Sequence, residues 1–548
     1  MVQNLTDAME ARRSSADDGD GLYRPLVGRP STTDSLTPAE EAAWDVSPPP
    51  PLTLWDAVKY MGPGWLVSIA YVDPGNYQAD ISSGKATGYS QNWVVLWTSL
   101  LSMYVQVLCV RLATRTRQTL SQAMADEYPD AIRYLLYFIA EFTVIITDLP
   151  EVIGFGFAIN LFSGIPTWIG VVLSLITTML FLSSQHFGFR ALELIVASFV
   201  GVMSVAIFVE WGLSDTDADA FLRGAFIPGI SGVKPDALTC LGIIGCVVMP
   251  HNLYLHSAAA LTRAPPKEKA ASKAHQDRAI LLGTLDLIVP VLVTVGINWG
   301  IVCLATIYVY DRDIDADLGI ASFPKYLDIR GGTVMWGFAL IAAAQSSCIT
   351  TTYSGQFVMD GFLKINLPMW SRAIMTRCVA VVPCVLVAAF TNSRTMEQMI
   401  DAVNASLAFL LPFALIPLVR LTTSRKFMGQ FVAGWIESVI IWAATLLCFG
   451  LNFYTLVAKE GGYFGQYTGM MNTLGVQMNI VQDVLCVFYT GCCVYMAFTP
   501  VKGSPLPMRE EMKALPAPHE ASAPEPTGNE SLQAAAMSEC DAADKQAH

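Results

Sequence analysis

Two short runs interrupt long apolar stretches of this chain, and each sets a helix breaker beside side chains that can bind a metal. The runs are AYVDPGNYQ at residues 70–78 and VMPHNLYLHS at residues 248–257. Their breakers are Pro74, Gly75 and Pro250. Proline removes a backbone donor and disfavours helical geometry in the residue before it, here Asp73 and Met249. Unwound backbone at membrane depth persists only where it is buried in protein or lines a cavity. Paired breaks in corresponding segments of two halves therefore indicate the substrate site of a transporter.

The composition is typical of a protein that crosses the membrane many times. Of the 548 residues, 53% are hydrophobic and only 14% are charged. Twelve apolar stretches reach the length of about 20 residues that crosses the hydrocarbon core. We therefore predict an all-α polytopic membrane protein with twelve transmembrane helices. The twelve cysteines include no CxxC pair, which favours apolar packing for most of them.

The predicted spans form two groups of five and a final pair. The segments are a disordered cytoplasmic N-terminal tail at 1–54, spans one to five at 55–213, an external loop at 214–237, spans six to ten at 238–421, spans eleven and twelve at 422–501, and a disordered cytoplasmic C-terminal tail at 502–548. The tails are polar and rich in proline, a composition that does not build a packed core. Because five is an odd number, the two groups cross the membrane in opposite orientations, and each begins with a broken span. This parity predicts an inverted repeat.

The charges between the spans indicate the orientation. One set of connections is basic and contains Arg111, Arg115, Arg117, Arg263, Lys267, Lys269, Lys273, Arg278, Arg420, Arg425 and Lys426. The opposite set is acidic and contains Asp215, Asp217, Asp219, Asp311, Asp313, Asp315 and Asp317. Basic connections favour the cytoplasmic side, so both termini are predicted to be cytoplasmic. YRPL at 23–26 fits a tyrosine-based sorting signal, which leaves the plasma membrane and the endosomal, lysosomal or vacuolar membrane as alternatives.

The two breaks together offer a mixed set of metal ligands. Asp73 and Asn76 are three residues apart in the first break, and Met249 comes from the second. A carboxylate, an amide oxygen, a thioether and the carbonyls freed by unwinding can surround a cation. Hard Ca²⁺ and Mg²⁺ prefer oxygen ligands, whereas a thioether favours late first-row ions. Mn²⁺ and Fe²⁺ fit such a site, and Co²⁺, Zn²⁺ and Cd²⁺ are compatible with it.

The alternative interpretation of the breaks is structural. A Pro-Gly step can kink a packing helix, Asn76 can satisfy freed backbone groups, and Met249 can fill a core. Asp73 favours the metal site, because a carboxylate inside the membrane costs about 2.5–3.5 kcal/mol on insertion scales and usually serves a function.

The third span carries three acids, Glu141, Asp148 and Glu151. Offsets of seven and ten residues place them within roughly 80° of one another on an ideal helix. Exposure to lipid would be costly, so we expect them to face the protein interior and to pair with a cation. Arg372 and Arg377 in the ninth span are the candidates. This pattern predicts a proton route beside the metal site, and a structural ion-pair network is the alternative.

Two histidines, His251 and His256, follow the second break. A zinc-binding pair on a helix is four residues apart with an intervening Glu. These histidines are five apart, about 140° around the helix, and no Glu lies between them. Imidazole titrates near physiological pH, so one or both are predicted to handle protons. For His256 a neutral ring hydrogen-bonded to a neighbouring helix is the alternative.

These motifs resemble those of the Nramp (natural resistance-associated macrophage protein) family of proton-coupled divalent metal transporters, which share the LeuT-type fold. The similar runs are DPGN at 73–76, MPHNLYLHS at 249–257, AAAQSSCITTTYSGQFVMDGFL at 342–363 and LPFALIPL at 411–418. The resemblance covers roughly residues 55–456. It implies two inverted five-helix repeats followed by two extra C-terminal helices.

The resemblance also implies roles for individual residues. The metal ligands would be Asp73, Asn76, Met249 and the backbone carbonyl of Cys246. Asp73 would accept the proton first, and His251 would tune proton coupling. The proton-exit network would comprise Glu141, Asp148, Glu151 and Arg377. Where many relatives place a metal-contacting Gln in the tenth span, this chain has Asn404, which is one methylene shorter, so contact through water is an alternative to direct contact.

We therefore predict a proton-coupled symporter that imports Mn²⁺ or Fe²⁺ into the cytosol by alternating access and functions as a monomer. It would use no cofactor besides the transported metal and protons, and its surroundings would be lipid, with no nucleic-acid partner. A metal-sensing membrane protein of the same fold without transport is the alternative. Asp73 and Met249 disfavour a sodium-coupled amino-acid carrier. An enzyme is not expected, because the sequence shows no nucleophile–base pair or complete catalytic metal motif.

Overall fold

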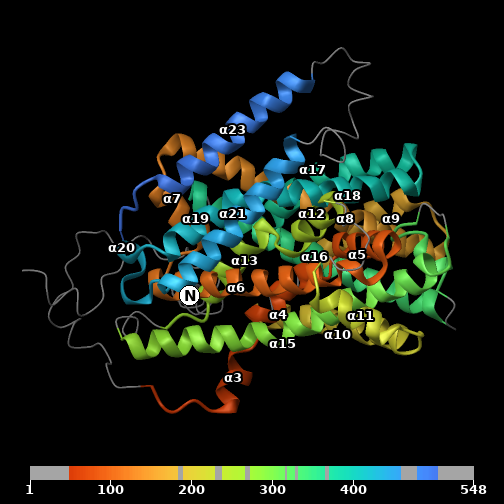
Figure 1. Ribbon diagram of the computed structural model, residues 1–548, viewed down its shortest axis with the longest axis horizontal. Coiled ribbons are helices and arrows are strands. Elements are labelled where there is room, and N and C mark those ends of the chain that lie inside the picture. The colour runs from red at the N-terminus through yellow and green to blue at the C-terminus, as the bar shows by residue number, and fades with distance from the viewer. Residues whose placement is uncertain are drawn as a thin grey trace, which may run out of the picture. The chain divides into compact units, whose positions relative to one another are not determined.

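The computed structural model describes residues 49–182, 189–228, 237–265, 272–314, 318–327, 331–364, 369–457 and 478–503. Every regular element within these ranges is a helix (Figure 1), which confirms the predicted all-α class. Most of each predicted tail and the YRPL run lie outside the described residues. Their predicted disorder and sorting role stay predictions.

The first predicted break is present. The elements around it are α4 (Pro63–Ser68), the 3₁₀ turn η1 (Ile69–Tyr71) and α5 (Pro74–Thr87). Asp73 is extended, with φ −77° and ψ 172°, and its side chain caps α5 by accepting a hydrogen bond from the Asn76 backbone N–H. Because Pro74 has no N–H and is pre-organised for a first helical turn, the new helix begins there.

Four asparagine side chains satisfy carbonyls that surround this first break. Each donates its amide Nδ2 to a carbonyl of this segment, and the pairs are Asn76 to Ala70 (3.0 Å), Asn252 to Val67 (3.1 Å), Asn298 to Tyr71 (2.8 Å) and Asn404 to Gly75 (2.9 Å). An unpaired buried carbonyl is costly, and no water is available in a membrane interior. These amides therefore make the unwound segment possible.

The second break lies between α12 (Ala237–Val247) and α13 (Pro250–Leu261). Met249 is extended, with φ −75° and ψ 127°, and its side chain makes no capping hydrogen bond. A third proline interruption behaves differently: Leu411, between α18 (Ser393–Leu410) and α19 (Pro412–Thr422), keeps helical angles of φ −54° and ψ −44°. The two sequence-predicted breaks are thus unwound, whereas the third proline only joins two helices.

The remaining helices surround these broken segments. They are α3 (Leu54–Tyr60), α6 (Asn92–Thr116), α7 (Leu120–Glu127), α8 (Asp130–Ser163), α9 (Thr167–Leu182), α10 (Phe189–Gly212), α11 (Ala218–Phe226), α15 (Lys273–Ala305), α16 (Gly332–Leu363), α17 (Met369–Phe390), α20 (Arg425–Met428), α21 (Trp435–Val457) and α23 (Met478–Phe498). Short turns of 3₁₀ helix lie at Gly88–Gln91, Phe323–Lys325 and Gly429–Phe431, and a π-helical turn continues α15 at Thr306–Tyr310.

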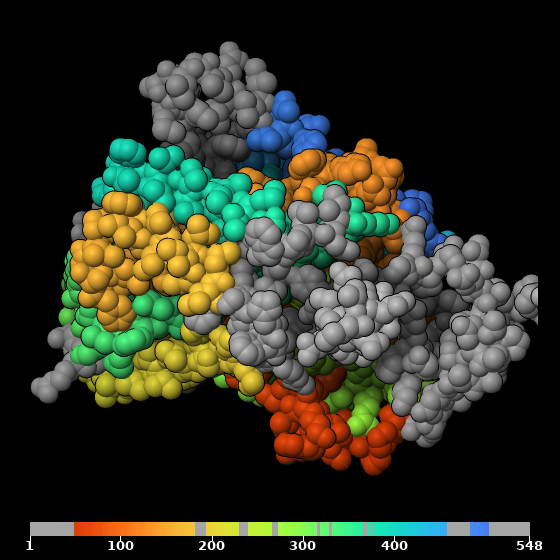
Figure 2. Space-filling model, turned by 180° about the vertical axis from the view of Figure 1, so that it is seen from behind, coloured from red at the N-terminus to blue at the C-terminus, as the bar shows by residue number. Residues whose placement is uncertain are grey.

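Seven helical stretches in the described residues are long and apolar enough to cross a membrane. One of them, Pro74–Thr116, joins the second half of the first predicted span, near 57–80, to the second predicted span, near 92–113. Three further apolar helices are shorter. The count of twelve spans therefore stays a prediction. Outer helices expose large apolar side chains, including Ile176 of α9, Val205 of α10 and Val382 of α17. These helices form much of the surface in Figure 2, where they are amber, yellow and teal. Such surfaces suit contact with lipid.

Two glycines permit close contacts between helices. Gly154 lets α8 approach the first broken helix, and Gly245 lets α12 approach Asn404 of α18. A Cβ atom added at Gly154 of α8 would lie 2.6 Å from the Pro74 side chain. A Cβ atom at Gly245 of α12 would lie 2.0 Å from the Asn404 carbonyl oxygen. Neither distance is possible for a real side chain, so any larger residue must push the helices apart.

We predict that Gly245→Ala destabilises the protein by about 1–3 kcal/mol, the usual cost of overpacking. Gly242, one turn earlier in α12, has open space at its Cβ position. Gly242→Ala is therefore the matched control and should be neutral or stabilising by up to about 1 kcal/mol, because Ala favours helix over Gly. Thermal unfolding in detergent measures both. Equal midpoints for the two variants would contradict the close contact.

Candidate metal site and acid network

The carboxylate of Asp73 is fixed at the start of α5. Its Oδ1 accepts hydrogen bonds from the Asn76 backbone N–H at 2.7 Å and from the Asn76 side-chain amide at 2.9 Å. The other oxygen, Oδ2, is buried and has no hydrogen-bond partner. Capping therefore orients the carboxylate and leaves one oxygen available.

Oxygens from both broken segments converge on a single nitrogen. The Asn76 Nδ2 donates to Asp73 Oδ1 at 2.9 Å, to the Ala70 carbonyl at 3.0 Å and to the Cys246 carbonyl at 3.0 Å. The first two acceptors lie in the first break, and Cys246 lies one turn before the second. The structure thus brings Asp73, Asn76 and the Cys246 carbonyl together, and their predicted role as metal ligands stays a prediction. The Ala70 carbonyl was not predicted, because no side-chain pattern reveals which freed carbonyl turns inward.

Asn404 borders the first break, and Met249 is buried in an apolar cluster beside it. Met249 is buried in the same apolar cluster as Ala70 and Cys246. Asn404 donates its amide to the Gly75 carbonyl, and its Oδ1 lies on the other side without a hydrogen-bond partner. A Cβ atom added at Gly75 would lie 2.8 Å from this Oδ1 and 3.1 Å from Asp73 Oδ1. Both oxygens therefore border the same small space, which only a glycine leaves open.

Three residues around this point have side-chain oxygens without a partner. Asp73 Oδ2, Asn76 Oδ1 and Asn404 Oδ1 are all buried and lack hydrogen-bond partners in the described residues. Buried polar atoms are nearly always paired, so a group of exceptions calls for an explanation such as an ion. Carboxylate, amide and carbonyl oxygens with one thioether form a donor set that a divalent transition metal accepts.

The three predicted acids of α8 form two separate ion pairs. Arg372 contacts Glu141 at 2.7 Å, and Arg377 makes a shorter contact with Asp148 while lying 4.0 Å from Glu151. Both arginines belong to α17, and Asp148, Glu151 and Arg377 are fully buried. The acids therefore face the protein interior, and each pair has its own cation.

The Cys348 sulfur also lies beside the ion pair that Arg377 makes with Asp148. Ligand atoms of Asp148, Glu151 and Cys348 of α16 lie within 4.8 Å of one another. Arg377 already fills this space, because its Nη1 bonds Asp148 and approaches the Cys348 sulfur at 3.0 Å. The arrangement is therefore that of an ion-pair network. Apolar packing was predicted for most of the cysteines, and no sequence pattern marked the position of Cys348 beside the acids.

The two histidines make different contacts. His251 Nδ1 lies 3.3 Å from the Thr147 hydroxyl, next to Asp148 in α8. His256 Nδ1 lies 2.8 Å from Gln106 of α6. His251 is thus connected to the acid-bearing helix, whereas His256 has the hydrogen bond to a neighbouring helix that the alternative interpretation described.

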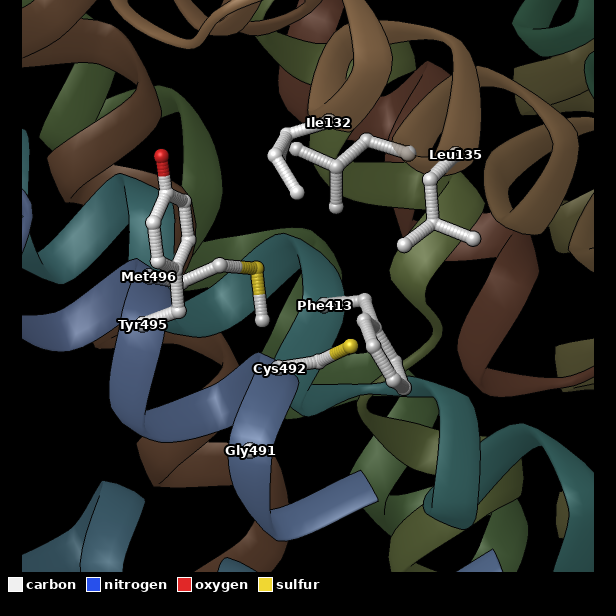
Figure 3. Close-up of a pocket in the computed structure, with 8 residues that line it drawn as sticks. Ile132, Leu135, Phe413, Gly491, Cys492, Tyr495 and Met496 are labelled. Atoms are coloured by element: carbon white, nitrogen blue, oxygen red, sulfur yellow. The ribbon is translucent and has the colours of Figure 1, made fainter. Parts of the chain in front are cut away.

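The pocket drawn in Figure 3 is unrelated to this site. It lies between α8, α19 and α23, where Leu135, Phe413 and Met496 are among the side chains that face it. Its lining is apolar apart from the Tyr495 side chain, so it offers none of the oxygen ligands found at the breaks.

Comparisons with known proteins identify a family, related sequences and a similar solved structure. Residues 64–458 match the family described as Natural resistance-associated macrophage protein-like. The chain is 35% identical over 457 residues to Metal transporter Nramp6 of Arabidopsis thaliana, covering 82% of this chain and 84% of that protein. It is 37% identical over 407 residues to Metal transporter Nramp1 of Populus trichocarpa, covering 73% and 75%. The crystal structure of the Eremococcus coleocola manganese transporter with an aromatic bis-isothiourea substituted compound superimposes with a TM-score of 0.71 at 25% identity, covering 83% of this chain and 97% of that chain.

Apolar helices that surround two unwound segments define an integral membrane protein of the transporter class. The two breaks and the acids of α8 all lie within the residues that match the family. The chain belongs to the Nramp family. This confirms the resemblance inferred from the motifs, and the relatives are named as transporters and not as enzymes.

We predict that Arg377→Met destabilises the protein by about 3–5 kcal/mol, because it leaves Asp148 as an uncompensated buried charge. The double variant Arg377→Met/Asp148→Leu should recover part of this loss, since it also removes the Asp148 charge and leaves only Glu151 without its cation. The control is Arg223→Met: Arg223 pairs with Asp219 at 2.7 Å, but both side chains are 72% exposed, so the expected cost is about 0–1 kcal/mol. Thermal unfolding in detergent compares them, and equal losses for the two single variants would contradict a buried pair.

Proposed function

We propose that this protein is a proton-coupled symporter that imports a divalent transition metal, Mn²⁺ or Fe²⁺, into the cytosol by alternating access. The observation that carries the proposal is the convergence of Asp73, Ala70 and Cys246 oxygens on one buried point between the two breaks. The named activities of the relatives, including manganese transport, support the same cargo.

The metal would bind among the side chains and carbonyls of the two breaks. Asp73, Asn76 and Met249 would supply side-chain ligands, and the Cys246 carbonyl would supply a backbone ligand. Asn404 Oδ1 borders the same space, which favours direct contact over contact through water. In the structure the Asn76 amide nitrogen occupies the point where these oxygens meet. Rotation of this amide would turn Oδ1 toward the metal.

Protons would leave by a route separate from the metal. Asp73 would accept a proton first, because its Oδ2 is buried and unpartnered. His251 connects the second break to α8 through Thr147, and Asp148 and Glu151 follow on that helix beside Arg377. Arg377 stabilises the charge that remains after a proton has moved on. Inward movement of positive charge is favoured by about 2.3 kcal/mol per charge per 100 mV of interior-negative potential.

The termini would be cytoplasmic, and the plasma membrane and endosomal, lysosomal or vacuolar membranes remain alternatives for the location. The protein would work as a monomer, since both breaks belong to one chain. Metal sensing without transport is the second hypothesis, and uptake measurements separate the two.

We predict that Asp73→Ala abolishes uptake of ⁵⁴Mn²⁺ into proteoliposomes with an inward proton gradient, because the variant removes both a metal ligand and the first proton acceptor. Asp219→Ala, at a largely exposed position of α11, is the control and should transport normally. If the wild-type protein binds Mn²⁺ in calorimetry but transports none, the sensing hypothesis is correct and the symporter proposal is wrong.

We predict that Met249→Ala weakens discrimination against Ca²⁺, because the remaining ligands are all oxygens. Excess Ca²⁺ should then inhibit ⁵⁴Mn²⁺ uptake at concentrations lower by roughly tenfold, the effect of about 1.4 kcal/mol. The control is Met203→Ala, which removes a methionine buried in α10. Unchanged inhibition by Ca²⁺ in the Met249 variant would exclude the thioether as a ligand.

A further inference from the structure

Six buried Ser and Thr side chains lie between residues 346 and 354 of α16, and two of them differ from the rest. Four donate hydrogen bonds to carbonyls of their own helix, namely Ser346, Thr350, Thr352 and Ser354. That is the common arrangement for a hydroxyl inside a helix. Ser347 and Thr351 instead donate to Glu151 of α8. Two neighbouring helices are thus joined at the acid network by side chains that helix formation alone does not require.

The two hydroxyls bind the same carboxylate oxygen. Ser347 Oγ donates to Glu151 Oε1 at 2.8 Å, and Thr351 Oγ1 makes a shorter contact with that oxygen. Four residues separate the donors, so they lie on one face of α16. The second oxygen, Oε2, has no hydrogen-bond partner and lies 4.0 Å from Arg377 Nη2. The two oxygens of this carboxylate therefore have different environments.

We propose that Ser347 and Thr351 are positioning residues that hold Glu151 with Oε2 free toward Arg377 and favour its ionised form. This inference rests on the proposed proton coupling. A proton that reaches Oε2 forms one O–H bond as the O–H bond of its donor breaks, and the reverse exchange passes it to the next acceptor. The hydroxyl protons of Ser347 and Thr351 stay in place throughout.

The ease with which Glu151 releases a proton depends on the hydrogen bonds that its carboxylate accepts. A hydroxyl bonds an ionised carboxylate more strongly than a neutral carboxyl, so two donors on Oε1 favour release of the proton from Oε2. They also restrict rotation of the carboxylate, which keeps Oε2 in the position for transfer. Without them, Glu151 would retain its proton longer and could present either oxygen.

The test compares the double variant Ser347→Ala/Thr351→Val with the control Ser346→Ala/Thr350→Val. The control removes the same two kinds of side chain from adjacent buried positions, but its hydroxyls donate only to the helix backbone. ⁵⁴Mn²⁺ uptake and proton influx, reported by an entrapped pH-sensitive dye, are measured in the same proteoliposomes over a series of external pH values.

We expect proton influx per Mn²⁺ to fall at least about tenfold in the test variant, because two hydrogen bonds to a charged group are lost and each is worth about a factor of ten. KM for Mn²⁺ should change by less than about twofold, because neither hydroxyl is placed among the metal ligands. Ser347→Ala/Thr351→Ser should restore part of the coupling, since Ser supplies a hydroxyl at the same position. The control variant should match the wild-type protein.

Three outcomes would overturn the inference. The test and control variants could both couple protons as the wild type does, or both could lose coupling to the same extent. The test variant alone could lose metal binding and proton influx in parallel. Ser347→Ala and Thr351→Val are also measured singly, so misfolding of the double variant does not remove the test. If wild-type uptake carries no proton influx, the proposed symport fails before any variant is compared. If the wild type is coupled and the test variant is equally coupled, only the inference fails.

Discussion

The structure depends on the hydrogen bonds that asparagine amides donate to backbone carbonyls around the first break. Asn76, Asn252, Asn298 and Asn404 come from four helices, and each satisfies one carbonyl between Val67 and Gly75. All four leave their Oδ1 atoms without a hydrogen-bond partner in the described residues. An ionised carboxylate could not replace them, because it has no donor, and a hydroxyl carries its donor and acceptor on one atom, whereas an amide carries them on two separate atoms. The same side chains that stabilise the unwound segment therefore surround it with oxygens.

Proline alone does not explain why two helices unwind and a third does not. Leu411 precedes Pro412 and stays helical, whereas Asp73 and Met249 are extended. At Asp73 the extended conformation gains a cap on α5 and amide partners for the freed carbonyls. Leu411 keeps its own helical partner, since its N–H still donates to the Leu407 carbonyl at 3.0 Å. The energetic difference therefore lies in what receives the backbone groups after unwinding.

The sequence predicted the breaks and their polar residues because proline and an intramembrane carboxylate have strong local consequences. It also predicted that Arg372 and Arg377 would be close to the acids of α8, since buried charges require partners. It could not predict that Glu141 has its own arginine, because helical periodicity shows only that the acids share a side. Asn252 and Asn298 were missed for a similar reason: their partners lie more than 180 residues away in the chain, and no local pattern marks them. The span count stayed open because broken and joined helices do not correspond one to one with apolar stretches.

The helix α8 links the candidate metal site to the acid network. Gly154 lies against Pro74 of the first break, and Thr147 contacts His251 just after the second. Between these two points Asp148 and Glu151 face Arg377 of α17. A rigid helix has a rise of about 1.5 Å per residue, so these contacts lie within roughly 11 Å along its axis. Any movement of the broken helices relative to α8 must therefore change the contact at Gly154, the contact at Thr147, or both. The acids lie between these contacts, and such a movement would alter their surroundings even though none of the proposed metal ligands belongs to α8.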